Sequence, residues 1–400
     1  MEGFFTSDVG LKKAPLPLIA RCGTCGLYRD CKSPKMPPSG KGKKRILLVA
    51  EAPGRQEDNN GIQFFGEAGT HLKDVLVKVG IDMREDCFLT NAATCRPPNN
   101  KLPKRSVDYC RPNLIRAVEE LQPEVIIPLG ESAVRSLLGW LWKGDSGTAI
   151  GRWVGWQIPC QKLNCWICPT WHPSYLLRNE ERATSVLDAL FERHLRDACS
   201  LQGRPWQEVP NYARQVNVIV DVERAAEAVY RLADGSKPVA IDYETNMLKP
   251  DSDRACIVSC AVSDGETTVS YPWHGKAIKA TKRLLRSKVP KIASNCKFEE
   301  RWTRREFGHG VRNWCFDTML AAHAIDSRPN TKSIKFQAWI LLGQGVWNAH
   351  IEPFLQGKGK NEENRIKEIS LDRLLLYGGM DALLEWQVAQ VQARKLGVNL

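Results

Sequence analysis

Residues 201–214 divide the chain into two parts that are expected to fold separately. This segment (LQGRPWQEVPNYAR) contains a glycine and two prolines, shows no apolar periodicity, and predicts a linker. A chain of 400 residues is also longer than one ordinary domain of about 150 residues. We therefore expect one domain over residues 1–200 and another over residues 215–400.

Composition and charge narrow the class of protein. Hydrophobic residues make up 43% and charged residues 26%, which excludes wholesale disorder. No apolar run approaches the about 18 residues that span a bilayer, and Asp8, Lys12 and Lys13 interrupt any secretory signal. The sequence thus predicts a cytoplasmic protein without a membrane partner. The net charge of +12 favours a polyanionic partner such as nucleic acid.

The first part alternates apolar strands with amphipathic helices. This order predicts an α/β domain whose parallel sheet carries helices on both faces. The expected strands are 46–50, 87–90 and 125–129, and the expected helices are 68–79, 107–121 and 132–142.

The second part begins with a new pattern. Several strands follow one another closely, which predicts an antiparallel meander, and the region after residue 293 is mostly helical. A segment rich in Gly, Lys and Asn, residues 343–364, predicts a mobile loop. The expected strands are 216–220, 238–242, 257–262 and 267–271, and the expected helices include 222–232 and 371–395.

Cysteines are concentrated in the first part, where nine of the fourteen lie before residue 170. Clustered cysteines in a reducing compartment indicate metal or redox chemistry rather than disulfides. The Cys22-x2-Cys25 pair, Cys95 and Cys110 could converge on one metal or cluster. Spacing alone does not separate zinc from iron–sulfur, and the Cys165-x2-Cys168 pair offers rival ligands.

Ordered motifs surround these cysteines. They are Glu51-Ala-Pro-Gly54-x2-Glu57-Asp58, Phe64-Phe65-Gly66-x-Ala68-Gly69, Thr90-Asn91-x3-Cys95-Arg96-Pro97-Pro98 and His172-Pro-Ser-Tyr-Leu-Leu-Arg178. Their order and spacing resemble the family 4 uracil-DNA glycosylases over about residues 20–200. The resemblance implies a uracil-DNA glycosylase-like α/β/α domain. It also implies a [4Fe-4S] cluster held by Cys22, Cys25, Cys95 and Cys110.

The same resemblance assigns roles to a set of side chains. A glycosylase holds its target nucleotide outside the base stack, in a fitted pocket. Glu51 is the candidate for positioning water or the base, because Ala52 stands where other glycosylase families carry a catalytic Asp. Departures from the family pattern are Ala50, Gln63 and Glu67. The implied roles are stacking on the base by Phe64, recognition of the uracil edge by Asn91, stabilisation of the departing anion by His172, filling of the vacated stack by Leu176, and phosphate contact by Arg178.

Carboxylates in the second part form another constellation. Asp242 and Glu244 follow an apolar strand at i and i+2, so both point to one face and could hold a hard divalent cation. Asn295-x-Lys-Phe-Glu299 opens a helix, and Tyr377-x3-Asp381 lies within the last helix. Four carboxylates and one tyrosine suit two-metal hydrolysis of a phosphodiester.

This second series resembles the Tyr-containing DEDD-type 3′–5′ exonucleases, such as the proofreading domain of family A DNA polymerases, over about residues 215–395. The resemblance implies a ribonuclease H-like α/β domain and a water-orienting role for Tyr377. It places Leu248 as a wedge between the last bases. Glu299 stands where Asp is usual. The implied ligands of two Mg²⁺ or Mn²⁺ ions are Asp242, Glu244, Glu299 and Asp381.

Together the two parts resemble the front end of certain bacteriophage DNA polymerases, although no polymerase domain follows before Leu400. We expect a DNA-processing enzyme with 3′–5′ exonuclease activity and a module that recognises or excises uracil. The alternative is a non-catalytic Fe–S docking component of a phage replication complex. Expected partners are single-stranded DNA or 3′ ends, with or without uracil, and a separately encoded DNA polymerase. A phage-encoded chain would act in the cytoplasm of its bacterial host.

Overall fold

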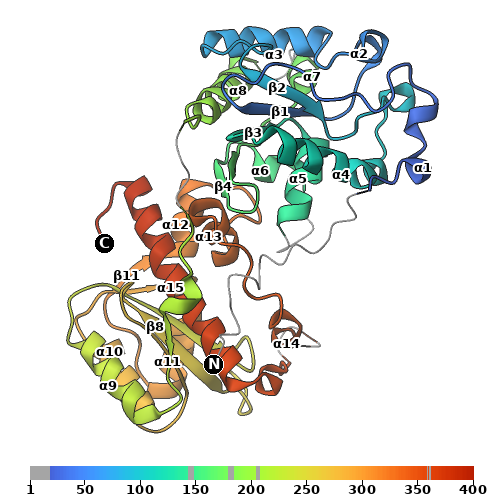
Figure 1. Cartoon of the computed structure of the whole chain (residues 1–400). Helices are drawn as coiled ribbons and strands as arrows, with labels where there is room; N and C mark the ends of the chain where they lie inside the picture. Colours follow the sequence, from blue (N-terminus) through green and yellow to red (C-terminus); the bar gives the residue numbers. More distant parts are fainter. Residues whose placement is uncertain (1–18, 143–147, 179–183, 204–207, 358, 360–361) are drawn as a thin grey trace. The chain divides into compact units, whose positions relative to one another are not determined.

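The computed structural model describes residues 19–142, 148–178, 184–203, 208–357, 359 and 362–400 (Figure 1). These residues form two compact units that divide between Glu208 and Val209. The division falls inside the segment predicted as a linker. Each unit has its own sheet and its own hydrophobic core.

The first unit is built on a five-stranded sheet with the order β2-β1-β3-β5-β4. Strands β2, β1, β3 and β5 run parallel, and β4 pairs with β5 as an antiparallel edge strand. The sequence did not predict this edge strand. The strands are β1 (Ile46–Ala50), β2 (Cys87–Asn91), β3 (Val125–Pro128), β4 (Ile158–Cys160) and β5 (Cys165–Ile167). The helices are α1 (Cys22–Cys25), α2 (Arg55–Asn60), α3 (Glu67–Lys78), α4 (Lys104–Leu121), α5 (Glu131–Leu141), α6 (Ile150–Trp153), α7 (Pro173–Leu177) and α8 (Thr184–Cys199).

Helices cover both faces of this sheet, as predicted from the alternation of elements (Figure 1). Strand β1 is buried along its whole length. Ile46 and Leu48 pack in one core with Leu72 of α3 and Phe191 of α8. Helices α4 and α5 lie on the opposite face. Continuous apolar strands are typical of parallel sheets buried on both sides.

The second unit contains a six-stranded mixed sheet with the order β11-β10-β7-β8-β9-β6. The predicted antiparallel meander is confirmed as β7-β8-β9, and the parallel strands β10 and β11 extend it. The strands are β6 (Val216–Val218), β7 (Val239–Thr245), β8 (Ile257–Ser263), β9 (Thr268–Pro272), β10 (Lys291–Ala293) and β11 (Trp314–Asp317). The helices are α9 (Val222–Ala233), α10 (Gly275–Arg286), α11 (Lys297–Phe307), α12 (Thr318–Ile325), α13 (Ile334–Leu342), α14 (Glu352–Leu355) and α15 (Leu371–Leu396).

Alternation along β7 separates its core face from its polar face. Val239, Ile241 and Tyr243 enter the core formed with α9 and α10. The intervening side chains, Asp242 and Glu244, therefore point to the opposite face, where helix α15 crosses the sheet. The fold thus places two carboxylates beneath the last helix.

A glycine pair lets α15 approach the sheet closely. A Cβ atom added to Gly379 would lie 2.3 Å from Cγ1 of Val216, and one added to Gly378 would lie 3.4 Å from Cγ of Glu244. Position 379 therefore has no space for a side chain, whereas position 378 has room for ordinary contact. The close crossing brings the helix against the polar face of β7.

We expect Gly379→Ala to destabilise the second unit. Overpacking costs about 1–3 kcal/mol, which exceeds the about 1 kcal/mol that Ala gains over Gly in a helix. Gly378→Ala is the matched control and should keep or slightly raise stability. Denaturant unfolding of the full chain measures both changes, and equal stabilities for the two variants would contradict this account of the helix crossing.

The segment 343–364, predicted as a mobile loop, is corrected by the structure wherever its residues are described. It contains α14, and Trp347 and Ile351 are buried. The backbone N–H of Asn364 donates to the carbonyl of Asn246 at 2.8 Å. The many Gly, Lys and Asn residues suggested mobility, but a few apolar anchors fix the segment to the unit.

Candidate active sites

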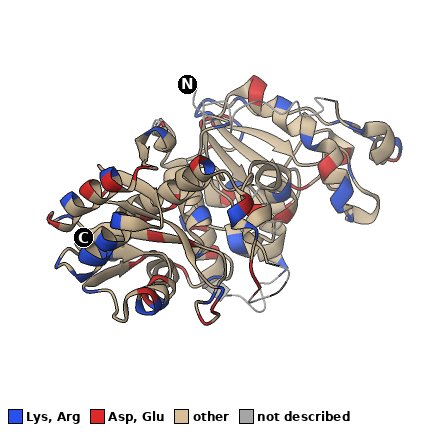
Figure 2. Ribbon diagram, turned by 90° about the horizontal axis from the view of Figure 1, so that it is seen from below, with Lys and Arg blue, Asp and Glu red and all other residues tan. Residues whose placement is uncertain are grey.

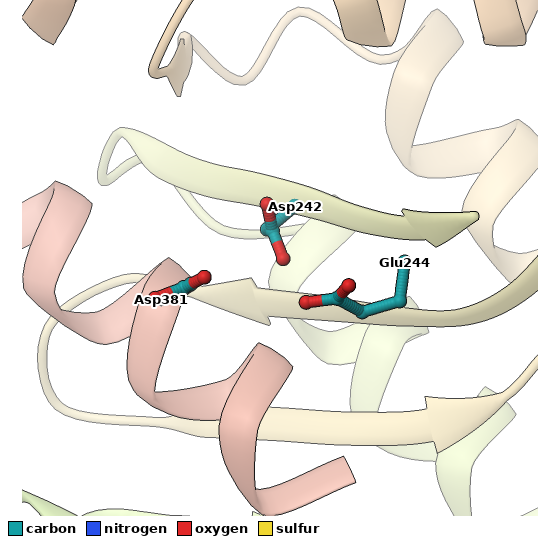
Figure 3. A group of neighbouring side chains, drawn as sticks. All are labelled: Asp242, Glu244 and Asp381. Atoms are coloured by element: carbon teal, nitrogen blue, oxygen red, sulfur yellow. The ribbon is translucent and has the colours of Figure 1, made fainter. Parts of the chain in front are cut away.

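Three carboxylates of the second unit meet at the crossing of β7 and α15. Asp242 and Glu244 come from the strand and Asp381 from the helix, and Figure 3 shows them side by side. One ligand oxygen of each lies within 4.8 Å of those of the other two. Within the described ranges, no other set of His, Cys, Asp or Glu side chains converges so closely. The arrangement can hold a divalent cation through oxygen ligands.

Two donors that the sequence analysis missed hold Asp381 in place. Nζ of Lys335, on α13, donates to Oδ2 of Asp381 at 2.8 Å and to the hydroxyl of Tyr377 at 2.9 Å. Nε1 of Trp347 donates to Oδ1 of Asp381 at 2.7 Å. Tyr377 and Asp381 share one helix face at i and i+4, as predicted. The tyrosine hydroxyl is thereby fixed beside the carboxylates.

Burial and the neighbouring carboxylates disfavour the charged forms of Asp242 and Glu244. Burial and then Asp381 raise the pKa of Asp242 to about 7. Burial, followed by Asp242 and Asp381, raises the pKa of Glu244 well above its ordinary value. Burial opposes the charge on Lys335, but the three carboxylates outweigh it and raise its pKa. The site thus contains more carboxylates than lysines, so it would attract a cation strongly.

Glu299 lies close enough to Asp242 to interact with it, but it is not one of the three convergent carboxylates. It is 3% exposed at the start of α11. Asp317 positions this helix, because its carboxylate accepts the backbone N–H groups of Asn295 and Cys296. Leu248, the predicted wedge, is 67% exposed and so has access to a ligand.

The stability of the metal-free second unit should fall as pH rises. The folded state raises the pKa of Asp242 to about 7, above the about 3.9 of an unfolded Asp, so folding favours its protonated form. The contribution of Asp242 to the free energy of unfolding is therefore largest below pH 4 and is lost as pH rises toward 7. Thermal unfolding in EDTA from pH 5 to 8 measures this trend, and Asp242→Asn should reduce its slope, since Glu244 still contributes. A wild-type profile that rises over this range would contradict the prediction.

In the first unit, the predicted pocket residues gather at the carboxyl ends of the parallel strands. Glu51 follows β1, Asn91 ends β2, and His172 follows β5. A Cβ atom added to Gly130, after β3, would lie 2.9 Å from Oε1 of Glu51 and 3.0 Å from Cβ of His172. The glycine, at φ 86°, therefore lets these two side chains approach. Ligands of open α/β sheets bind at this edge.

Phe64 adopts a backbone conformation that is uncommon for an aromatic residue, with φ 54°. Its N–H donates to Oε1 of Glu57 at 2.7 Å. A Cβ atom on Gly69 would lie 2.1 Å from the carbonyl oxygen of Phe64, so only glycine fits there. Such strained conformations persist where the surroundings impose them, often at ligand sites. The ring itself is 6% exposed.

Asn91 is 1% exposed, and neither Oδ1 nor Nδ2 has a hydrogen-bond partner in the described part of the chain. A buried amide that lacks both partners is costly unless a ligand or water supplies them. An amide offers one acceptor and two donors, which match the edge of a pyrimidine such as uracil. The amide can therefore pair with a group that offers both a donor and an acceptor.

His172 is held as a neutral donor. Its Nδ1 accepts the backbone N–H of Ser174 at 3.2 Å, which assigns the proton to Nε2. Burial, followed by Arg178, lowers its pKa to about 4. Burial likewise raises the pKa of Glu51. The Nε2–H can donate to a developing anion without first changing its charge.

Leu176, predicted to fill the vacated stack, is 4% exposed and packs in the core with the strands. Its wedge role stays a prediction. The helical turn of α7 directs position 176 inward. Arg178, predicted to contact phosphate, is exposed.

The four predicted cluster cysteines line one cavity. Leu27, Tyr28 and Tyr109 complete its wall. Four thiols around one cavity are a donor set that suits either a structural zinc ion or an iron–sulfur cluster. The cysteines are Cys22, Cys25, Cys95 and Cys110.

Donors surround these sulfurs, as expected for thiolate ligands. The N–H groups of Lys35 and Thr94 donate to Sγ of Cys95 and Cys110 at 3.2 and 3.4 Å. Such hydrogen bonds are one of the means by which proteins tune iron–sulfur clusters. The rival pair is not part of this cavity: Cys165 lies on β5 opposite Cys160 of β4.

The net positive charge is spread along the chain rather than confined to one element. Figure 2 shows Lys and Arg interspersed with Asp and Glu on many helices and loops. None of the helices in the described ranges is long and apolar enough to cross a bilayer. The two sites, rather than a single basic surface, are therefore the features that indicate function.

These observations define the class of the protein: two α/β domains, a uracil-DNA glycosylase-like domain and a ribonuclease H-like exonuclease domain with an acidic cluster. Residues 37–196 match the uracil DNA glycosylase superfamily, and residues 217–391 match the 3′-5′ exonuclease domain of family A DNA polymerases. The chain belongs, through its first unit, to the type-4 uracil-DNA glycosylase family. It is 37% identical over 164 residues to the type-4 enzyme of Pyrobaculum aerophilum, covering 40% of this chain and 82% of that protein.

Similarity to a bacteriophage protein extends across both units. The chain is 28% identical over 371 residues to a DNA polymerase of Bacillus phage SP01, covering 82% of this chain and 38% of the polymerase. The chain therefore spans well under half of that polymerase. Among solved structures, Brucella melitensis NrnC is similar, with 19% identity, a TM-score of 0.34, and coverage of 46% of this chain and 80% of that chain.

Proposed function

We propose that the second unit hydrolyses DNA from the 3′ end with divalent ions held by Asp242, Glu244, Asp381 and Glu299. The observation that carries this proposal is the convergence of three carboxylates within 4.8 Å. Mg²⁺ or Mn²⁺ would activate water and stabilise the charge that develops on phosphate. The matching exonuclease family supports this function, and one relative of the fold was solved with bound Mg²⁺.

The chain's own groups supply position and orientation. Lys335 and Trp347 fix Asp381, so this carboxylate is oriented before an ion arrives. The Tyr377 hydroxyl accepts from Lys335 and interacts with Asp381, so it is held beside the carboxylates, where it is proposed to orient the attacking water. The exposed Leu248 is proposed to separate the terminal bases.

We further propose that the first unit recognises uracil and excises it. The unpartnered amide of buried Asn91 supports uracil recognition, and the neutral His172 supports stabilisation of the departing anion. Phe64 would stack on the base, and Arg178 would contact phosphate. Glu51 adjoins His172 across Gly130 and is proposed to position water.

A paired assay tests the two activities separately. Loss of a labelled 3′ nucleotide from single-stranded DNA, with Mg²⁺ or Mn²⁺, reports the nuclease. Alkali-sensitive breakage of a uracil-containing oligonucleotide in EDTA reports glycosylase activity, because EDTA silences the nuclease. Absence of both activities would favour a non-catalytic docking role and overturn the proposal.

The cysteine cavity is proposed to hold a [4Fe-4S] cluster, which would link the segments around residues 22, 95 and 110. We expect Cys95→Ser to abolish absorbance near 400 nm and to destabilise the first unit, because metal binding is coupled to folding. Cys160→Ser, outside the cavity, is the matched control and should keep the colour. A colourless wild-type preparation with stoichiometric zinc would contradict this proposal.

A further inference from the structure

Glu385 is a buried acid to which neither the family resemblance nor the sequence motifs give a role. It lies on α15 one turn after Asp381, so both side chains occupy the same face of the helix. It is 3% exposed, and its Oε2 has no hydrogen-bond partner in the described ranges. A buried carboxylate oxygen without a partner is costly, so its presence requires an explanation.

The charged groups that face Glu385 are mostly acids. Asp242, Glu299 and Asp381 all interact with it unfavourably, in that order. The nearby cation is Lys335, but its Nζ donates to Tyr377 and Asp381. The surroundings therefore offer Glu385 no dedicated counter-charge.

Two neighbouring acids have the same deficiency. Oδ2 of Asp242 and Oε2 of Glu299 also lack partners among the described residues, and Glu299 is as buried as Glu385. The three acids come from different elements, β7, α11 and α15. The three acids interact with one another, and each has a free carboxylate oxygen of the kind that a hard divalent cation binds.

We propose that Glu385 is a ligand of the divalent ion held between Asp242 and Glu299. This inference rests on the proposed exonuclease function, to which it adds a carboxylate from the last helix. Glu299 carries one methylene more than the usual Asp, which changes where its carboxylate can reach. Glu385 would add a second ligand from α15, besides Asp381, to the site. The remaining coordination positions are left for water and the phosphate of DNA.

Mn²⁺ binding to the full chain tests this role without relying on activity. Electron paramagnetic resonance of free Mn²⁺ would count bound ions in the presence of thymidine 5′-monophosphate, a phosphate probe that can bridge two ions. Wild type should bind two ions at this site, and Asp242→Asn should lose them. Glu385→Gln should weaken one of the two by at least about tenfold, as should Glu299→Gln. Asp372→Asn, an exposed acid on the same helix, is the matched control and should leave both ions bound.

The outcomes separate the two proposals. No Mn²⁺ bound by wild type at the Asp242 site would overturn the proposed exonuclease function itself. Two ions bound equally well by wild type and Glu385→Gln would overturn only the role of Glu385. Thermal unfolding checks the fold of the variant: in EDTA, Glu385→Gln should be at least as stable as wild type, because an uncompensated buried acid is removed. Its stabilisation by Mn²⁺ should be smaller than that of wild type. A variant that is less stable in EDTA yet keeps the full Mn²⁺ stabilisation would show a structural role instead.

Discussion

Asp242→Asn should lower 3′–5′ exonuclease activity by about 10³-fold or more. Asp242 interacts with Asp381, Glu244 and Glu299, so it is the carboxylate common to all the proposed ion contacts. Metal ions supply several kcal/mol of charge stabilisation, and each 1.36 kcal/mol is a factor of ten in rate. Release of a labelled 3′ nucleotide in Mg²⁺ measures the loss.

The same variant offers two controls for this prediction, its stability without metal and its uracil release. The asparagine keeps the size of Asp242 and removes one buried charge, so the folded protein should be at least as stable without metal. Uracil release by the same variant should remain at the wild-type rate, because the first unit is unaltered. Nuclease turnover within about tenfold of wild type would exclude Asp242 from the ion site.

Short-range patterns in the sequence were sufficient to locate the principal carboxylates. Asp242 and Glu244 share a face because side chains alternate along a strand, and Tyr377 and Asp381 share one because they are four residues apart on a helix. Both relations depend only on local geometry. The structure confirms the strand, the helix and the meander around them.

The residues that complete this site depend on tertiary packing and were missed. Lys335 reaches Asp381 because α13 packs against α15, and Trp347 does so because a Gly-rich segment folds back onto the unit. The sequence signal for Trp347 was a tryptophan within the Gly-rich segment 343–364. The signal for Glu385 was clearer, because it is an acid four residues after the motif residue Asp381 on the same helix. Strands β10 and β11 have three and four residues, too few to show a period.

The first unit shows the same division between local and tertiary information. The resemblance to the glycosylases singled out Asn91 and His172, and the structure places both near the carboxyl ends of parallel strands. The pattern could not predict that Gly130 brings Glu51 and His172 together, since that contact depends on a positive φ and on the approach of two separate loops. Nor could it predict the burial of Leu176, which depends on how α7 packs in the core.

His172→Ala should lower uracil release by about 10²- to 10³-fold, the usual effect of removing a donor to a developing anion. The reason is specific to its protonation: Nδ1 accepts from Ser174, and a pKa of about 4 keeps the ring neutral, so Nε2–H is available at neutral pH. Release measured in EDTA from a uracil-containing oligonucleotide should therefore show no dependence on histidine titration between pH 5.5 and 8. The exonuclease activity of the second unit should be unchanged in this variant, just as uracil release should be unchanged in Asp242→Asn. Equal uracil release by wild type and His172→Ala would remove His172 from the chemistry and leave the unpartnered Asn91 amide as evidence for recognition alone.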